Sequence, residues 1–536
     1  MSEFNLIEEK WIPCITPDGE LAEYGIRDAL LKAHVLREIH DDSPLITVAV
    51  HRLLLAILYR IHDGPQDLQA WRDLYTGGSF SAAGINRYLS QWSNRFDLFA
   101  ENHPFFQMAE LETKREVSVN RLATQCASGN NATLFDHCGD EEPVDWPPSQ
   151  VARELVACQS FALGFGQSGN AKINGQNEAL PYFSDAIALR GMSIWLQGIT
   201  LFDTLMVNLA PMKDNSLPPW ELGDAHKHRD RGAGKIRKVV TSLGVVDRLT
   251  WQSRLVRLLP NDGTVSRMYF MQGRSADKSP GDLMKAYRAS KEEGVTAVPL
   301  STSKAAWRDA HSILMIPAPT SNERRPECFN TVARARSIGM VQPEKQFVAH
   351  VVGLASAPGK AGKFELWRHD RMPVPAPLLG DAHLIERLGG LLQEAEQIAI
   401  ELNYRTRRIA RLYLAPYAED GGRKPDKNDV NRLTETIDPR PAYWARLENQ
   451  FFTLLENLPN DLDTAGDGGK PDDQQTATNT WRMLVKKEAQ RALEESIRSL
   501  GTTARAIQAV ARVRTDFNDD DLKRRPQKQV GTGERR

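Results

Sequence analysis

The chain has 536 residues, of which 41% are hydrophobic and 26% charged, and its formal net charge is −1. This length is too great for one compact core, so two or three domains of an ordinary soluble composition are expected. The neutral balance excludes bulk attraction to nucleic acid, so any nucleic-acid surface must be a local patch. Five separated cysteines without a CxxC pair argue against disulfides and a zinc site, and favour a reducing cytoplasm.

Extended and helical patterns alternate in the first part of the chain. The start lacks the basic and apolar stretches of a secretory signal. Extended residues 4–15, followed by the turn Pro17-Asp18-Gly19, predict a strand–turn–strand opening. Helices are expected over the ranges 26–39, 43–62 and 82–97.

The longest apolar run, residues 46–61, is broken by His51, Arg52 and Arg60 and is too short to span a membrane. We therefore expect a buried helix with Ser43 as its N-cap, and no membrane partner. The polar, aperiodic residues 113–150 predict a long loop.

The middle of the chain contains its most basic part. A helix is expected from Trp195 through Leu209, and residues 265–375 alternate short apolar runs with turns, which predicts β-rich structure. Between them, residues 227–257 contain nine Lys or Arg against two Asp. Such a patch suits a phosphate backbone, and a solvated basic face without a ligand is the alternative.

The C-terminal part is helical. Apolar residues keep a helical period over 382–414, and further helices are expected over 440–458, 475–499 and 501–513. The predicted fold class is α+β, with a large mixed N-terminal domain (1–375) followed by a C-terminal four-helix bundle (380–515). Residues 516–536 are charged, lack an apolar face, and predict a disordered tail.

A glycine-rich stretch from Gly164 to Gln176 is the strongest candidate for a binding loop. Its glycines permit positive φ and close approach of backbone N–H groups to a ligand, and Lys172 adds a positive charge. Phosphates and base edges are the ligands that such donors suit. The spacing to Lys172 is wrong for a P-loop, and no βαβ unit surrounds the glycines. A nucleotide cofactor is therefore disfavoured, and a purely structural turn stays open.

The other short motifs in the sequence give little support to a metal site or a catalytic site. His226, His228 and Asp230 alternate as metal ligands on a strand would, but the surrounding glycines and arginines argue against a strand. His40-Asp41-Asp42 lacks the further histidines of a metal phosphohydrolase. No catalytic triad or carboxylate pair stands out, so no enzyme, cofactor or metal is predicted.

Several separated motifs occur in one order that resembles a known family, the CasA large subunit of the type I-E CRISPR surveillance complex Cascade. The matching pieces are Trp11-Ile12-Pro13, His103-Pro104-Phe105-Phe106-Gln107, residues 131–137, Gly164-Phe165-Gly166 with Gly169 and Gly175, Trp251-Gln252, and Ser303-Lys304-Ala305-Ala306-Trp307. Each is weak alone, and their order across about 300 residues is specific.

The resemblance implies a non-catalytic cytoplasmic protein that reads the protospacer-adjacent motif in double-stranded DNA. It implies that the protein promotes duplex opening for crRNA pairing and helps recruit a helicase-nuclease, with crRNA-bound Cascade subunits as partners. Base pairing then supplies the sequence specificity, as in another RNA-guided effector. A glycine loop and a lysine finger would read the minor groove, where base information is degenerate, and a wedge would enter between base pairs.

Residues are carried over to this chain as follows. The glycine loop is Gly164, Phe165, Gly166, Gln167, Ser168 and Gly169, with Lys172 nearby. Gln167 and Ser168 replace glycines of the best-known pattern, which would alter the accepted motif. The lysine finger falls on Lys291, near Arg288. The glutamine wedge falls near Arg336 and Ser337, where no glutamine stands. A DNA- and crRNA-contacting loop would use Leu134, Phe135 and Asp136.

Two rival functions stay open. One is an enzyme acting on nucleotides or nucleic acid, with the glycine loop as a phosphate cradle. The other is an interaction scaffold without a ligand.

Overall fold

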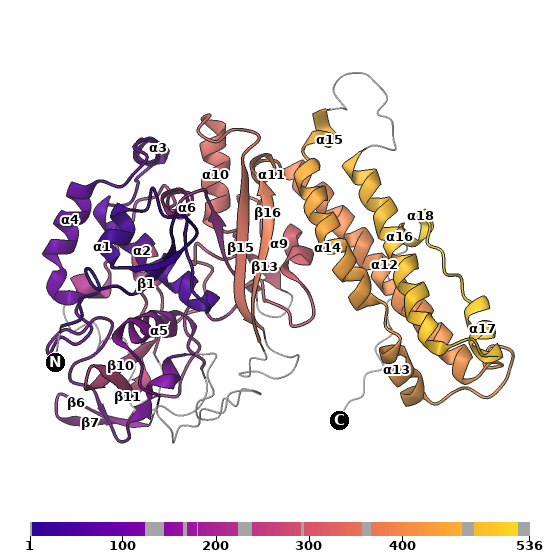
Figure 1. The fold of residues 1–536 in the computed structure, drawn as a ribbon, viewed down its shortest axis with the longest axis horizontal. Helices are drawn as coiled ribbons and strands as arrows, with labels where there is room; N and C mark the ends of the chain where they lie inside the picture. The colour runs from indigo at the N-terminus through magenta and orange to yellow at the C-terminus, as the bar shows by residue number, and fades with distance from the viewer. Residues whose placement is uncertain are drawn as a thin grey trace. The chain divides into compact units, whose positions relative to one another are not determined.

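The computed structural model describes residues 3–123, 144–164, 169–179, 181–222, 238–290, 294–355, 366–463 and 476–523. The chain divides into two compact units, Met1–Met372 and Pro373–Arg536 (Figure 1). The first mixes helices with small sheets, and the described part of the second is helical after the end of strand β16. The predicted α+β class with a helical C-terminal region is confirmed.

The described helices of the first unit include a buried central one, α2. They are α1 (Ile26–Leu31), α2 (Pro44–Ile61), α3 (Leu68–Thr76), α4 (Ala82–Gln91), α5 (Pro148–Phe161), α6 (Leu201–Asn208), α8 (Val245–Leu249), α9 (Ala310–Leu314) and α10 (Glu327–Ser337). Helix α2 begins after Ser43 as predicted, with Pro44 in its first turn. It packs against α5, α8, α6 and strand β15 (Gln346–Ala355). Among the described helices it alone is long and apolar enough to cross a membrane, yet it is 89% buried inside the fold.

Within the described residues, six small sheets accompany these helices. Their orders are β2-β1-β3, β10-β11-β5, β12-β9, β13-β14, β16-β15-β8 and β4-β6-β7. The strands are β1 (Ile12–Ile15), β2 (Leu21–Tyr24), β3 (Glu38–Ile39), β4 (Glu112–Thr113), β5 (Val117–Ser118), β6 (Asn170–Ile173), β7 (Gln176–Ala179), β8 (Ser193–Gln197), β9 (Val239–Val240), β10 (Arg254–Asn261), β11 (Thr264–Gln272), β12 (Ser275–Ala276), β13 (Tyr287–Ser290), β14 (Gly294–Ala297), β15 and β16 (Leu366–Pro375).

Several predicted elements differ from the structure. The predicted helix at 26–39 ends at Leu31, and the chain re-enters the first sheet as β3. Trp195 and Leu196 lie in strand β8 and only the following residues form helix α6, because an unbroken apolar run has no period that separates strand from helix. The predicted loop 113–150 contains β5, a short 3₁₀ helix at Val119–Leu122 and the start of α5.

Hydrogen-bonded side chains link four strands of the first unit: β3, β8, β15 and β16. Gln197 on β8 donates to Glu38, with 2.6 Å between nitrogen and oxygen, and accepts a hydrogen bond from His350 Nε2 at 2.7 Å. His350 Nδ1 lies 2.9 Å from His369 Nε2 on β16. Burial, with the neighbouring His369, lowers the pKa of His350 to about 2, and burial lowers the pKa of His369 to about 4.

These histidines make the stability of the unit acid-sensitive. An imidazole that stays neutral in the fold is protonated in the unfolded chain below pH ~6.5, so the free energy of unfolding falls as the pH drops from there towards 4. We expect His350→Gln to flatten this dependence by about one proton, or roughly 1.4 kcal/mol per pH unit. Urea unfolding between pH 7 and 5 measures it, with exposed His34→Gln as control. Identical slopes for the two variants would contradict the assignment.

The second unit is built on one long helix. Its helices are α11 (Ala376–Gly380), α12 (Ala382–Leu414), α13 (Lys427–Thr436), α14 (Arg440–Asn457), α15 (Asn460–Asp463), α16 (Ala477–Ile497), α17 (Ala504–Ala511) and α18 (Asp519–Lys523). Asp381 caps α12 by accepting from the N–H groups of His383 and Leu384. Helices α13, α14, α16, α17 and α18 all pack against α12.

The predicted disordered tail was wrong for residues 516–523. Asp521 is fully buried and its Oδ1 lies 3.0 Å from Arg405 Nη2 on α12. The Arg405 guanidinium also lies 4.0 Å from the centre of the Phe517 ring. A buried ion pair therefore fixes this charged segment, which helical periodicity could not reveal. Residues 524–536 lie outside the described part of the chain.

Candidate nucleic-acid interface

Gly164, the first residue of the glycine loop, is held against a second segment. Its N–H donates to Asp185 Oδ1 at 3.0 Å. A Cβ atom at this position would lie 2.3 Å from the backbone nitrogen of Asp185 and 2.5 Å from the carbonyl carbon of Ser184. Only glycine therefore fits here without moving backbone. Residues 165–168, with Phe165, Gly166, Gln167 and Ser168, lie outside the described part of the chain.

Arg254 anchors the same loop from inside the protein. Its Nη2 donates to the carbonyl oxygens of Leu163 at 2.7 Å and Ser184 at 2.8 Å. Its Nη1 donates to Ser253 O and to Gln272 Oε1. Burial lowers the pKa of Arg254 to about 10. This arginine is 1% exposed, so it positions the start of the loop and offers no charge to a phosphate.

The predicted basic patch at 227–257 is therefore wrong in part. Arg248 and Arg254 are buried, and Arg248 Nε donates to Ser242 Oγ. Trp251 is also buried, with the Arg274 guanidinium 3.6 Å from its ring centre. Arg257 is exposed, and residues 227–237 fall in an undescribed stretch. Charge counting fails here because it does not distinguish core arginines from surface ones.

The second half of the glycine-rich stretch is a β-hairpin. Strands β6 and β7 pair through Ile173 and Gln176, and the turn residues Asn174 and Gly175 both have positive φ. Ala171 and Ile173 pack into a core cluster with residues of β10 and β11. Lys172 points away from this core, is about half exposed, and lies 3.9 Å from Glu112. Gly169, with φ +79, precedes this hairpin in open space.

The predicted lysine finger lies between strands β13 and β14. Ser290 pairs with Gly294, and residues 291–293, which include Lys291, connect them outside the described structure. The Arg288 guanidinium is held within the fold, because it donates to the carbonyl oxygens of Tyr287, Arg324 and Met315. Burial lowers its pKa. Arg288 thus supports the base of the hairpin.

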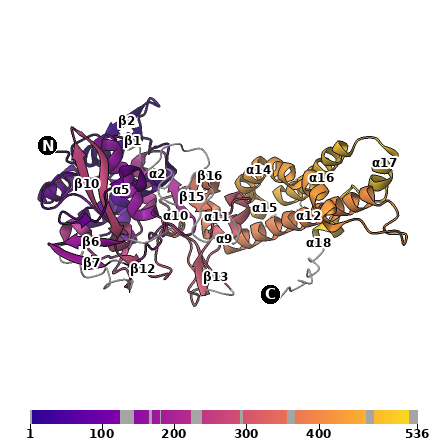
Figure 2. The same ribbon diagram turned by 90° about the horizontal axis from the view of Figure 1, so that it is seen from below.

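Segment 185–192 connects the glycine loop to this hairpin. Ala186 N–H donates to Ala162 O at 2.9 Å, and Met192 N–H donates to Val298 O at 3.0 Å, just after β14. In Figure 2, strands β6, β7, β12 and β13 lie toward the same lower edge of the unit. Segment 185–192 therefore links Gly164, where the glycine loop begins, to the base of the β13–β14 hairpin.

A buried ion pair supports the hairpin base. Arg52 Nη1 on α2 lies 2.8 Å from Asp282 Oδ2, and both side chains are at most 1% exposed. Burial alone would raise the pKa of Asp282, but Arg52, with Lys285 and Arg248, lowers it to about 2. Burial lowers the pKa of Lys285 to about 8.

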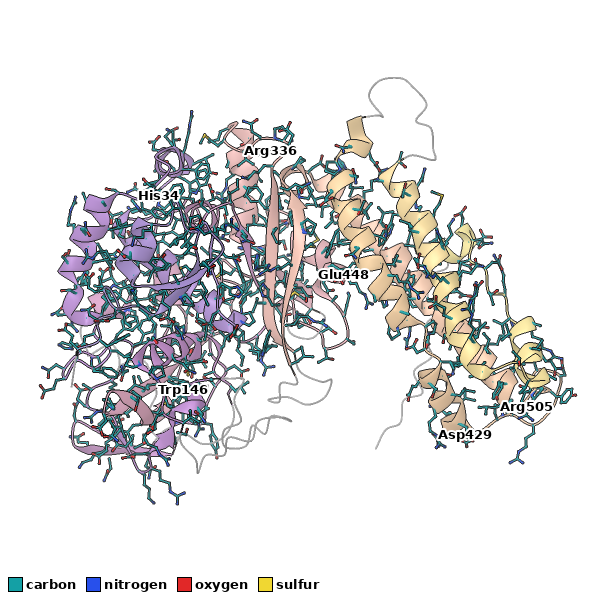
Figure 3. The ribbon with its side chains drawn as sticks, in the orientation of Figure 1. His34, Trp146, Arg336, Asp429, Glu448 and Arg505 are labelled. Carbon is teal, nitrogen blue, oxygen red and sulfur yellow. The ribbon has the colours of Figure 1, made fainter. Side chains whose placement is uncertain are left out.

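Arg336 and Ser337 lie away from these elements. They end helix α10, whose first residue bonds to Leu283 near the hairpin base, and 11 residues of helix rise about 15 Å. Figure 3 shows Arg336 at the opposite edge of the unit from Trp146, which pairs with β11 through Val265. The structure does not bring these residues to the glycine loop. Leu134, Phe135 and Asp136 fall in an undescribed stretch.

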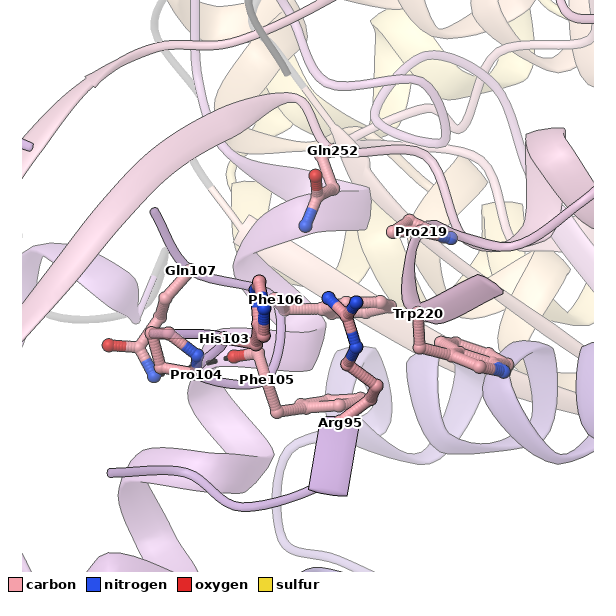
Figure 4. Close-up of a pocket in the computed structure, with 9 residues that line it drawn as sticks. All are labelled: Arg95, His103, Pro104, Phe105, Phe106, Gln107, Pro219, Trp220 and Gln252. Carbon is pink, nitrogen blue, oxygen red and sulfur yellow. Dashed lines mark hydrogen bonds between the residues drawn. The ribbon is translucent and has the colours of Figure 1, made fainter. Parts of the chain in front are cut away.

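A small pocket contains the motif at 103–107 (Figure 4). Its lining is Arg95, His103, Pro104, Phe105, Phe106, Gln107, Pro219, Trp220 and Gln252. Gln107 donates to Leu98 O at 2.8 Å and accepts from Leu258 N–H at 2.9 Å. Phe106, with φ +52, stacks with both Phe105 and Trp220, which also stack with each other. These contacts give the motif a packing role.

The described side chains offer no evident metal site. No group of three or more His, Cys, Asp or Glu within the described ranges could hold an ion. Cys14, Cys158 and Cys328 are free and buried.

These features define a two-unit α+β protein in which one segment links the start of a glycine loop to the base of a β-hairpin. The family model of CRISPR-associated protein Cse1 matches residues 5–492, and the chain belongs to this family.

The comparisons extend over nearly the whole chain. It is 28% identical to a CRISPR-associated protein CasA/Cse1 of Thermus thermophilus over 96% of this chain and 97% of that protein. The crystal structure of Thermus thermophilus CasA matches 95% of this chain and 97% of its own at TM-score 0.74 and 25% identity. A chain of a CRISPR RNA-guided surveillance complex matches 96% of this chain and 99% of its own at TM-score 0.74 and 20% identity, which shows the shared fold.

Proposed function

We propose that this chain is the large, non-catalytic subunit of a Cascade surveillance complex in the cytoplasm, with crRNA-bound subunits as partners. It reads the protospacer-adjacent motif in double-stranded DNA, promotes duplex opening for crRNA pairing, and helps recruit a helicase-nuclease. Membership of the Cse1 family supports this proposal, and so does a same-fold chain in an RNA-guided surveillance complex.

The single observation that carries the DNA-reading role is the link that segment 185–192 makes between Gly164, at the start of the glycine loop, and the base of the β13–β14 hairpin. The backbone bonds of this segment go to Ala162, two residues before Gly164, and to Val298, the residue after β14. Backbone N–H groups of a glycine loop and a lysine side chain are donors that suit the acceptors of the minor groove. Arg288, Arg336 and Ser337 fall outside this proposed contact surface, because Arg288 bonds to carbonyls and the other two lie at the far end of α10.

Lys291→Ala tests this role in the assembled complex. We expect binding of motif-containing DNA to weaken about 5- to 150-fold, since a specific base contact contributes about 1–3 kcal/mol. Binding of DNA without the motif should change little. Titration of both DNAs measures the ratio, with the exposed Lys10→Ala as matched control. If Lys291→Ala and the alanine variants at positions 290, 292 and 293 all keep the motif discrimination of the parent complex, this turn does not supply the lysine finger.

The rival enzyme is tested separately. ATP hydrolysis or DNA nicking by the purified chain, abolished by Gly166→Asp, would replace the non-catalytic proposal with a phosphate-cradle enzyme.

A further inference from the structure

The segment between the glycine loop and the hairpin has one basic side chain, Arg190. Met192, two residues on, bonds to Val298 at the hairpin base. Two residues span at most about 7 Å, so Arg190 lies next to that base. Arg190 also contacts Asp185, whose carboxylate accepts the N–H of Gly164 at the start of the glycine loop.

Asp185 orients the Arg190 side chain. Arg190 Nε donates to Asp185 Oδ2 at 2.6 Å, while Asp185 Oδ1 accepts the Gly164 N–H. One carboxylate therefore fixes both the arginine and the first residue of the glycine loop. The Arg190 side chain is still 53% exposed.

The backbone at Arg190 is fixed as well. Lys285 is 2% exposed, and its Nζ donates to the carbonyl oxygens of Ala188, at 2.9 Å, and Arg190. Gly191 follows with φ +82, and a Cβ there would lie 2.5 Å from the Ala297 Cβ on β14. Backbone and Nε contacts thus limit the freedom of this arginine before any ligand binds, which reduces the entropy cost of a contact.

We infer that Arg190 contacts a backbone phosphate of the DNA between the glycine loop and the hairpin. The guanidinium is planar and always charged, its geometry suits phosphate oxygens, and about half of the side chain faces solvent. A phosphate contact strengthens binding of any duplex and carries no sequence information. This inference rests on the proposed function.

The test is the salt dependence of DNA binding by the assembled complex. We expect Arg190→Gln to reduce the slope of log K against log salt concentration by about 0.9, the value for one phosphate contact. Arg190→Lys should retain the slope. Arg87→Gln, which removes an exposed arginine on α4, is the matched control and should leave the slope unchanged.

Two results would overturn the inference. One is a slope for Arg190→Gln equal to that of the parent complex. The other is loss of motif discrimination without a change in slope, because that assigns Arg190 to base reading or loop positioning. The Lys291→Ala titration is independent of both, so Arg190 can fail while the proposed function stands.

Discussion

Gly164→Ala is expected to weaken motif-dependent DNA binding by the assembled complex about 5- to 150-fold, if the added methyl costs the ~1–3 kcal/mol typical of overpacking. The new Cβ would meet the backbone of Ser184 and Asp185 at 2.3–2.5 Å, and backbone cannot give way as a flexible side chain can. The loop must then leave Asp185, which holds its first N–H. Binding curves with and without the motif measure the effect.

Gly25→Ala is the matched control for this variant. A Cβ at Gly25 would lie 2.4 Å from the Ile7 carbonyl oxygen, which is a similar clash with backbone in a different part of the first unit. Both variants should lower the thermal midpoint, but Gly25→Ala should retain motif discrimination. Equal discrimination in the two variants would remove the start of the loop from the reading surface.

Arg52→Met is expected to lower the free energy of unfolding by about 3–5 kcal/mol, because it removes the ion-pair partner of the buried Asp282 carboxylate. The carboxylate of Asp282 is 1% exposed, so water cannot replace the lost guanidinium. Chemical denaturation at pH 7 measures the loss. Since the folded pKa of Asp282 lies below its unfolded value, the contribution of the pair is present above pH ~4 and is lost as the pH falls towards 2.

Two further variants test whether the loss of stability in Arg52→Met comes from the buried charge of Asp282. Arg52→Met combined with Asp282→Asn should be less unstable than Arg52→Met alone, because no charge is then left unpaired. Lys32→Met removes a half-exposed pair with Asp28 and should cost under about 1 kcal/mol. A similar loss for Lys32→Met and Arg52→Met would show that the buried pair has no special role.

Periodicity predicted the long helices well. The apolar spacing over 382–414 matches α12 residue for residue, since a helix with one buried face repeats its apolar residues every three to four positions. Helix α13 was missed because only Val430 and Thr434 are buried in a polar sequence. The helix expected at Trp195 was wrong because β8 is buried on both faces, and such strands lack alternation.

The candidate site was predicted only in outline. The glycines indicated which stretch of the sequence forms the candidate binding loop. Arg254, Asp185 and Lys285 form hydrogen bonds with residues about 20 to 100 positions away in the sequence. Such contacts leave no local sequence pattern. Arg254 and Arg257 look alike in sequence, yet one lies in the core and the other faces solvent.

The pairing of β8 with β15 has a consequence during protein synthesis. Residues 193–197 bond to residues 348–352, and α2 packs against the same β15. At about 5–20 residues per second, the ribosome needs roughly 8–30 s to supply the second strand after the first. During that interval the edge of β8 that pairs with β15, and the part of α2 that packs against β15, lack their partner on the nascent chain. The first unit is therefore a candidate client of ribosome-associated chaperones, and fragments that end before residue 348 should aggregate.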